Sequence, residues 1–460
     1  MTPGEKQPFI VVLTSHWASM LGVALATTAG FSWLFVLPTQ MGGQAANAYI
    51  GLLTAVVIPA VFLLGLALIP FGMWRGRRTI RAGIASAPTR DGRMAWRRLG
   101  LFLGLMTFVN LVIGSQGTYR AVQHMESRQF CGQTCHVMTP EFTAARYFNH
   151  AGIACVECHI APGAAGFISA KLAGTRQLMD VAFDRYPRPI KSAIEDNRLV
   201  PAAETCEKCH NRARELGPRI KVLTHFKDDE ANSRIETVLT MRVGGPTSGI
   251  HGAHIGAGVL IRFAPADARR QTIPWVERKA ADGTVTTFVV VDAKPDAIAL
   301  LPRYEMQCTD CHNRAAHSME TAEKAVDRSL AAGEIPLSLP FIRKNALALV
   351  TKAPNAAGIA ESLKGIYAGK SPDADIARAA GALTGLYNRN VFPDLKVTWG
   401  TYPNNLGHMD TPGCFRCHDD SHTSALPARK TITNDCAACH EAVAMEETAP
   451  AVLKTLGINR

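Results

Sequence analysis

The chain has 460 residues, of which 47% are hydrophobic and only 19% charged, a low charged share for a soluble protein. Its formal net charge is +11, and most of this charge lies in residues 75–98, which contain eight arginines and a single aspartate. Because this excess is local and no basic stripe alternates with aromatic residues, we exclude nucleic acid as a partner. The length allows two or three domains.

Three apolar segments begin the chain: residues 9–37, 49–74 and 99–118. The first carries no charge and is long enough to span a bilayer. A signal peptide is the alternative, since Ala46-Asn47-Ala48 resembles a cleavage site, but the apolar run is too long for a signal sequence. The sequence therefore predicts three transmembrane helices.

The arginine-rich loop between the second and third segments predicts the topology, because short basic loops stay in the cytoplasm. Everything after about residue 118 is then expected outside. His16 lies in the first segment, and an ionisable group within a membrane span is a functional candidate. No other histidine lies in a predicted span, so a haem held there by two histidines is not expected. The alternative is a polar residue at the interface or facing the bundle.

Six motifs, each with two cysteines and an adjacent histidine, use all 12 cysteines. This pattern is typical of c-type haem attachment, in which the cysteines bond the porphyrin and the histidine ligates the iron. The first motif has three residues between its cysteines, and the other five are CxxCH. The six motifs are Cys131/Cys135/His136, Cys155/Cys158/His159, Cys206/Cys209/His210, Cys308/Cys311/His312, Cys414/Cys417/His418 and Cys436/Cys439/His440.

Haem c is attached outside the cytoplasm, which agrees with the predicted topology. We therefore expect six covalently bound haem c groups in a three-pass protein of the cytoplasmic (inner) membrane, with the haem domain on the periplasmic side. Zinc is one alternative, because the last four cysteines have the spacing of a zinc ribbon. A zinc ribbon, however, needs no histidine after each second cysteine. Disulfides are another alternative, but cysteines three apart rarely bridge without strain.

Electron-transfer haems need a second strong ligand on the iron. Met138 follows His136 by two residues and is the candidate for the first haem, unless it merely packs against the ring. We expect at least one of His251 and His254 to ligate, and His124 is a weaker, juxtamembrane candidate. The alternative for each histidine is a lone surface residue. The full set of candidate second ligands is Met138, His150, His225, His251, His254, His317, His408 and His422.

Outside the apolar segments, the periodicity of apolar residues predicts a few helices and strands. Residues Gly163–Asp184 form an expected amphipathic helix, and helices are also expected over Thr321–Ala332 and Pro340–Thr351. Alternating or β-branched residues predict short strands at Thr237–Val243, Gly258–Phe263, Thr272–Arg278 and Thr284–Asp292. Elsewhere we expect little regular structure, because haems supply much of the interior.

These elements suggest four domains in a mainly α membrane protein. The predicted division is a membrane anchor (1–118), a domain with haems 1–3 (119–215), a small β-rich insert without haem sites (216–305), and a C-terminal domain with haems 4–6 (306–460). The haem-carrying part is expected to be a multihaem cytochrome c domain low in regular structure.

The stretch from Phe130 to about Asp184 resembles the NapC/NirT family of membrane-anchored, quinol-oxidising cytochromes. The residues that carry the resemblance are CHVM at the first motif, the spacing His150-x4-Cys155, and CHIAPG followed by GFISAK. The resemblance implies that the first haem receives electrons from menaquinol or ubiquinol and that Met138 ligates its iron. It also implies that Lys171 and Asp180 line the quinol pocket. This chain differs in its CxxxCH motif and in having three apolar segments where one is typical.

The sequence favours a quinol dehydrogenase, if the protein is an enzyme. Quinol from the membrane pool would be oxidised at the outer face of the membrane, and electrons would pass to a periplasmic or outer-membrane acceptor. A terminal reductase with an open haem site is one alternative, although candidate ligands outnumber the irons. The other is an electron-wire subunit of a larger respiratory complex, without a quinol site of its own.

Overall fold

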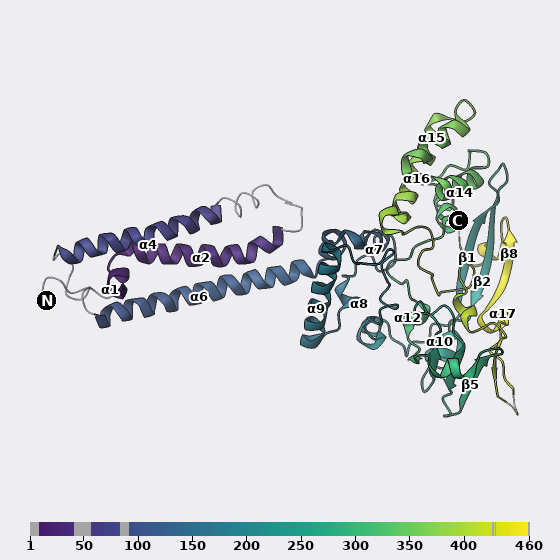
Figure 1. Cartoon of the computed structure of the whole chain (residues 1–460). Coiled ribbons are helices and arrows are strands. Elements are labelled where there is room, and N and C mark those ends of the chain that lie inside the picture. Colours follow the sequence, from purple (N-terminus) through teal and green to yellow (C-terminus); the bar gives the residue numbers. More distant parts are fainter. Residues whose placement is uncertain (1–8, 41–56, 83–91, 426, 428, 459–460) are drawn as a thin grey trace. The chain divides into compact units, whose positions relative to one another are not determined.

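The structure is a computed structural model that describes residues 9–40, 57–82, 92–425, 427 and 429–458. It divides into two compact units, Met1–Thr134 and Cys135–Arg460 (Figure 1). The possible cleavage site at Ala46–Ala48, the first eight residues of the second predicted span (49–56) and residues 83–91 of the arginine-rich segment lie outside the described residues.

The first predicted span forms two helices, α1 (Phe9–Thr14) and α2 (Trp17–Gln40), which are separated at Ser15 and His16. The Ala18 N–H donates to His16 Nδ1 at 3.1 Å, and the Ser19 hydroxyl donates to the His16 carbonyl at 2.8 Å. These bonds occupy backbone groups that the interrupted helix leaves unpaired. His16 therefore has a local role at the start of α2.

Helix α4 (Ile58–Arg81) packs closely against α2 through small residues. A Cβ atom added at Gly72 would lie 2.2 Å from the Ser19 nitrogen, and one at Gly65 would lie 2.6 Å from the Ala26 nitrogen. Such close backbone approach through small side chains is typical of helices packed in membranes. Figure 1 shows α2, α4 and α6 (Gly92–Met125) running side by side within this unit.

Helices α4 and α6 are the two in the described residues that are long and apolar enough to cross a membrane. Both expose large apolar side chains, such as Leu63 on α4 and Phe108 on α6, as lipid-facing helices do. The chain is therefore a membrane protein, and the three-pass topology remains a prediction. Helix α6 has 34 residues and extends past the predicted end at 118, since no glycine or proline interrupts the chain from there to Met125.

In the second unit, four helices without a haem motif pack around their own core: α13 (Ala322–Ala331), α14 (Ile342–Lys352), α15 (Ala356–Tyr367) and α16 (Asp373–Asn390). Their apolar faces meet at side chains such as Val326, Ile342, Leu363 and Leu383, all fully buried. The two helices predicted here are confirmed as α13 and α14. The expectation of sparse regular structure does not hold for this cluster, because its core is made by the chain itself.

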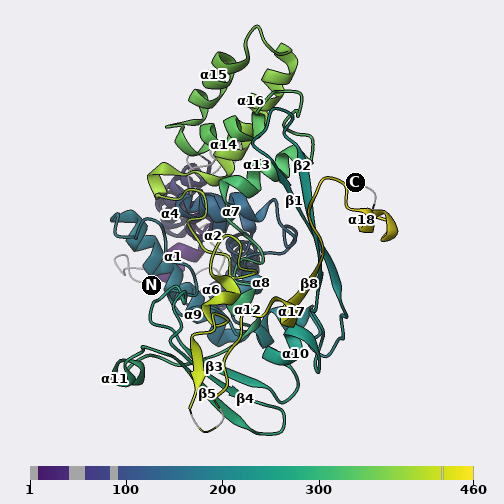
Figure 2. The same cartoon turned by 90° about the vertical axis from the view of Figure 1, so that its right-hand side faces the viewer.

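The described strands form two antiparallel sheets (Figure 2). The first has the order β1-β2-β8 and the second β6-β3-β4-β5-β7. The predicted strands are confirmed as β2, β3, β4 and β5. Strands β1 and β6 were not predicted, and neither were β7 and β8, which come from the C-terminal part. The strands are β1 (Arg219–Phe226), β2 (Arg234–Met241), β3 (Leu260–Ala264), β4 (Trp275–Lys279), β5 (Val285–Val290), β6 (Tyr304–Glu305), β7 (His422–Ser424) and β8 (His440–Glu447).

Short helices and turns connect these parts and carry the cysteine motifs. Helix α9 (Gly163–Ala182) confirms the predicted amphipathic helix and is the longest of them. The others are η2 (Phe130–Thr134), η3 (His136–Met138), α7 (Thr139–Ala145), α8 (Val156–His159), η4 (Ala202–Glu204), η5 (Cys206–Lys208), α10 (Gly249–Ile255), α11 (Pro295–Ala299), α12 (Cys308–Cys311), η6 (Pro393–Leu395), η7 (Gly413–Arg416), α17 (Cys436–Cys439) and α18 (Ala451–Thr455).

Candidate functional site

Each of the five CxxCH motifs forms a single helical turn. In all five, the backbone N–H of the motif histidine donates to the carbonyl of the first cysteine, as at His210 with Cys206 (2.8 Å) and His312 with Cys308 (2.8 Å). Residues three apart on such a turn lie on the same side, so both thiols point toward one partner. In the first motif, residues Phe130–Thr134 form a π-helical turn, whose wider winding accommodates the additional residue.

Five motif histidines each face a second histidine. The ring centroids are 5.8–6.4 Å apart in every pair. Two imidazoles that share one metal ion place their centroids roughly 6 Å apart, because each nitrogen lies about 2 Å from the metal. The pairs are His159 with His317, His210 with His150, His312 with His251, His418 with His254, and His440 with His408.

Backbone carbonyls orient several of these rings. His150 Nδ1 lies 3.0 Å from the Ala315 carbonyl, His254 Nδ1 lies 2.7 Å from that of Ile250, and His418 Nδ1 lies 2.8 Å from that of Thr433. Since a carbonyl only accepts, each Nδ1 carries the proton and leaves the Nε2 lone pair free. Metal-ligating histidines are oriented in the same way.

All ten paired histidines line one connected cavity of about 2350 Å³ in the second unit. This exceeds the roughly 300–1,000 Å³ of a pocket for one small ligand, and close-packed interiors hold few voids larger than a water molecule. Cysteines of the second to sixth motifs line it as well. The cavity therefore has the size, the ligands and the attachment points for several porphyrins.

Burial favours the metal-binding form of these imidazoles. It lowers the pKa of His317 to about 4, and it also lowers the pKa values of His159, His254 and His312. A neutral ring is the form that can bind iron. Within the described residues, His317 Nδ1 and His440 Nδ1 are buried without a hydrogen-bond partner, so no protein group competes with a metal ion for these two rings through that nitrogen.

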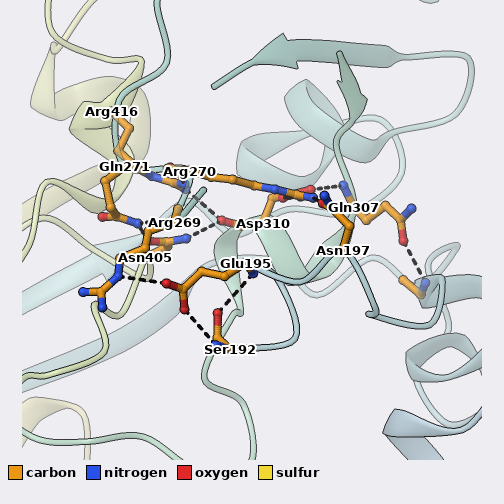
Figure 3. Close-up of polar contacts among 11 residues, drawn as sticks. Ser192, Glu195, Asn197, Arg269, Arg270, Gln271, Gln307, Asp310, Asn405 and Arg416 are labelled. Carbon is orange, nitrogen blue, oxygen red and sulfur yellow. Dashed lines mark hydrogen bonds and ion pairs between the residues drawn. The ribbon is translucent and has the colours of Figure 1, made fainter. Parts of the chain in front are cut away.

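A buried polar network joins the fourth and fifth motifs (Figure 3). Asp310, between the cysteines of the fourth motif, pairs with Arg270 at 2.8 Å, and both side chains are largely buried. Arg416, between the cysteines of the fifth motif, donates to the carbonyls of Asp310 and Arg270, each at 2.8 Å. The Asn405 amide donates to the same Asp310 carbonyl at 3.0 Å. These contacts fix the two cysteine turns relative to each other.

Two predicted ligands face other groups. His422 is 1% exposed, and its Nδ1 and Nε2 lie 2.8 Å from Asp419 and 2.6 Å from the Ile273 carbonyl. Both nitrogens are thus occupied. His225 lines the cavity with its Nδ1 3.2 Å from Asp327, which leaves its Nε2 free, but no motif histidine faces it among the described contacts. The structure therefore gives no support to a ligand role for His422, and a ligand role for His225 remains a prediction.

The remaining alternatives for the cysteines find no support either. The described residues, which include all 12 cysteines, contain no disulfide and no cluster of three or more histidine, cysteine or acidic side chains arranged to hold a metal ion by themselves. In the described residues, the last four cysteines are thus not gathered as they would be in a zinc ribbon. Their two motifs instead face His254 and His408 through His418 and His440.

The sequence of this chain is similar to those of known proteins. Residues 94–221 match the N-terminal region of the NapC/NirT cytochrome c family. The chain is 34% identical over 447 residues to the cytochrome c-type protein ImcH of Geobacter sulfurreducens. The aligned region covers 92% of this chain and 87% of that relative. The chain belongs to the NapC/NirT cytochrome c family. Membership establishes a c-type cytochrome with covalently bound haem. No solved structure is significantly similar to this NapC/NirT chain.

The first motif of this NapC/NirT protein differs from the others. Within the described residues, the ring recorded against His136 is that of Tyr186, at 6.4 Å, and not a second histidine. Met138 lines the large cavity and packs in a cluster with Val137. His124 packs edge-on against Phe130 at 5.5 Å in the first unit. The first site thus lacks the histidine pair of the other five.

The two residues that the family resemblance implicates in quinol binding lie on α9. Lys171 and Asp180 are nine residues apart, which is two and a half helical turns, so they point to opposite sides of the helix. The ammonium of Lys171 lies 4.9 Å from the centre of the Phe167 ring. The structure does not bring the two side chains together, and they cannot hold the same quinol oxygen.

Sequence reasoning missed a buried cluster at the cavity wall. Glu141 is 8% exposed, and its Oε2 has no hydrogen-bond partner in the described part of the chain. Burial raises the pKa of Glu141 to about 7, although the charge of Arg314 and a hydrogen bond with Tyr402 oppose the shift. Arg314 itself lies 4.2 Å from the Tyr402 ring centre. Nothing in the local sequence distinguishes Glu141, because the residues that surround it come from distant segments.

Proposed function

We propose that the protein is a membrane-bound hexahaem c-type cytochrome that oxidises quinol at the outer face of the cytoplasmic membrane. Electrons would pass to a periplasmic or outer-membrane acceptor. The observation that carries the proposal is the set of five histidine pairs around one cavity. When bound, each haem iron takes up or releases one electron. An iron held by both histidines of a pair would have no open position for a substrate, which favours electron transfer over reductase chemistry at these five sites.

The chain's own contribution is attachment, orientation and spacing. The cysteine turns present both thiols on one side, and the carbonyls of Ala315, Ile250 and Thr433 fix three of the imidazole rings. The buried pair of Arg270 and Asp310, together with Arg416, keeps two of the turns at a constant separation. Because the haems would share one cavity, electrons would pass between neighbouring haems over short distances. Rigid ligands favour transfer because little reorganisation accompanies it.

Quinol oxidation also releases two protons, which need acceptors at the membrane surface. Asp180 is the candidate proton acceptor, and Lys171 is the candidate anchor for a ring oxygen. Because they point to opposite sides of α9, we assign them separate contacts, and their substitutions should act independently. The first motif, which has no histidine pair, is the candidate site at which electrons enter from quinol. Met138 is the candidate second ligand of the iron there.

The experiment uses the haem-loaded protein in native membranes, reduced with a menaquinol analogue and followed by haem absorbance. Lys171→Ala and Asp180→Asn should each slow quinol-driven reduction, by about tenfold or more if the group contacts quinol. Dithionite should still reduce every haem in both variants. Arg176→Gln, on the same helix and exposed, is the matched control and should leave the rate unchanged.

Two results would overturn parts of the proposal. Unchanged quinol kinetics in both variants would place the quinol site elsewhere on the chain. If the wild-type protein is reduced by dithionite but not by any quinol, it is an electron-wire subunit that receives electrons from a partner. A ferric spectrum dominated by high-spin signals would favour the terminal reductase.

A further inference from the structure

Helix α9 exposes an unusual amount of apolar surface. None of its 20 residues is buried. Six large apolar side chains are 39–69% exposed in the full chain: Phe167, Ile168, Leu172, Leu178 and Met179 on the helix and Phe183 at its end. At about 100° per residue these six fall within a sector of about 160°, so they form one face. We call this set the apolar face of α9.

The large haem cavity does not account for this face, because none of the six side chains lines it. Exposed apolar patches of this kind mark a binding surface for protein or membrane. The pattern is also inverted relative to an ordinary surface helix of a soluble protein, in which the exposed side is polar.

Cations lie within and beside the apolar face: Lys171 falls inside its sector, and Arg176 lies about 20° beyond its edge. The Lys171 ammonium lies 4.9 Å from the Phe167 ring centre, and the Arg185 guanidinium lies 5.2 Å from the Phe183 ring centre. Arg176 is exposed on the same helix. Aromatic and aliphatic side chains flanked by lysine and arginine are typical of helices that lie in the plane of a membrane interface, where cations reach anionic headgroups.

A helix able to cross a membrane precedes α9 by a short stretch of sequence. Helix α6, one of the two long enough to cross a bilayer, ends at Met125, and α9 begins 38 residues later at Gly163. We propose that α9 is an interfacial helix whose apolar face is inserted among the lipid acyl chains of the membrane that α4 and α6 cross. This inference does not depend on quinol oxidation.

The test uses the full-length, haem-loaded protein in nanodiscs that contain phosphatidylethanolamine and phosphatidylglycerol. All 12 natural cysteines belong to haem motifs, so an introduced cysteine is the single reactive thiol. Ile168→Cys and Leu172→Cys probe the apolar face. Gln177→Cys is the matched control, because Gln177 is exposed and lies nine residues, and thus half a circumference, from Ile168.

Two measurements are made on each variant. The first is the rate of modification by a charged, water-soluble maleimide. The second is cross-linking to a phospholipid that carries a photoreactive group in its acyl chain. We expect Ile168→Cys and Leu172→Cys to react about tenfold or more slowly than Gln177→Cys and to cross-link to lipid, whereas Gln177→Cys does not.

Equal maleimide rates on both sides of the helix would overturn the inference, because the apolar face would then be in water. Slow modification without lipid cross-links would also overturn it, since another part of the protein would cover the face. The haem content and visible spectrum of each variant show that it is folded. No quinol is present, so failure of this test is distinct from failure of the proposed function.

Discussion

Arg416 donates from Nη2 to the backbone carbonyl of Asp310 at 2.8 Å, and each residue lies between the two cysteines of a different haem motif. The same guanidinium donates to the carbonyls of Arg270 and Gly413 at 2.8 Å. One side chain therefore joins the fourth motif, the fifth motif and the loop that precedes β4. The separation of the two sites depends on a planar group with several fixed donors.

Replacing Arg416 by glutamine should destabilise the protein, because three carbonyls lose a charged donor. We expect a loss of about 2 kcal/mol or more in the free energy of unfolding, since a buried acceptor left unpaired costs about 1–3 kcal/mol. Thermal unfolding of the haem-loaded protein measures it. Arg378→Gln is the control, because its pair with Asp375 is exposed and long at 3.7 Å. Equal losses in both variants would contradict a special role for Arg416.

Removing His150 should expose one iron at the third motif, because His150 faces His210 and not the neighbouring second motif. His150→Ala should convert one low-spin haem to high spin in an electron paramagnetic resonance spectrum. His225→Ala, also at the cavity wall, should leave the spectrum unchanged. Removing the third haem through Cys206→Ala and Cys209→Ala should abolish the new signal. If the signal survives, His150 serves another site.

Gly413 precedes the first cysteine of the fifth motif and has a φ of 50°. A Cβ atom there would lie 1.7 Å from the Gly407 carbonyl oxygen, which accepts the Cys414 N–H at 2.9 Å. Gly413→Ala should therefore displace Cys414, and the intact mass should show a fraction of molecules with one haem fewer. Gly365→Ala, where nothing lies within 4 Å of the added carbon, should retain the full set.

Glu141 should make stability depend on pH in a defined window. Burial raises its pKa from 4.5 to about 7, so the folded protein keeps this proton at pH values where the unfolded chain has lost it. Stability should then fall as the pH rises from about 4.5 to about 7, by up to about 3 kcal/mol. Glu141→Gln, which resembles the protonated acid, should remove this loss. Denaturation at pH 5 and pH 8 measures it.

The control for this prediction is Glu361→Gln, which changes an exposed carboxylate on α15. It should retain the pH dependence of the wild-type protein. If Glu141→Gln also retains it, the carboxyl of Glu141 is ionised in the folded protein over this range.

Sequence patterns within short segments predicted the structural features that those segments determine by themselves. The cysteine motifs, the strands β2–β5 and the helix α9 are encoded in spacing and periodicity over short segments. The pairing of histidines is not, because it depends on contacts between distant segments. His422 follows His418 by four residues, yet its nitrogens bond Asp419 and Ile273. The partner of His418 is instead His254, 164 residues earlier.

The same reason explains the elements that were missed. Strand β8 begins at the motif histidine His440, and its residues do not alternate in polarity as a half-buried strand would. It is ordered by pairing with β2, more than 190 residues away in the chain. The break between α1 and α2 falls at Thr14-Ser15-His16, a short polar stretch inside an otherwise apolar segment that we predicted as one helix. Glu141 likewise acquires its environment from Arg314 and Tyr402.

The histidine pairs also define an order of completion as the chain is synthesised from its N-terminus. The third site is the first with both of its histidines available, once His210 has followed His150. The second motif emerges earlier, but His159 must wait for His317, which appears after His312 has completed the fourth site. A chain synthesised only as far as residue 316 would thus carry the second attachment site and lack the histidine that faces it.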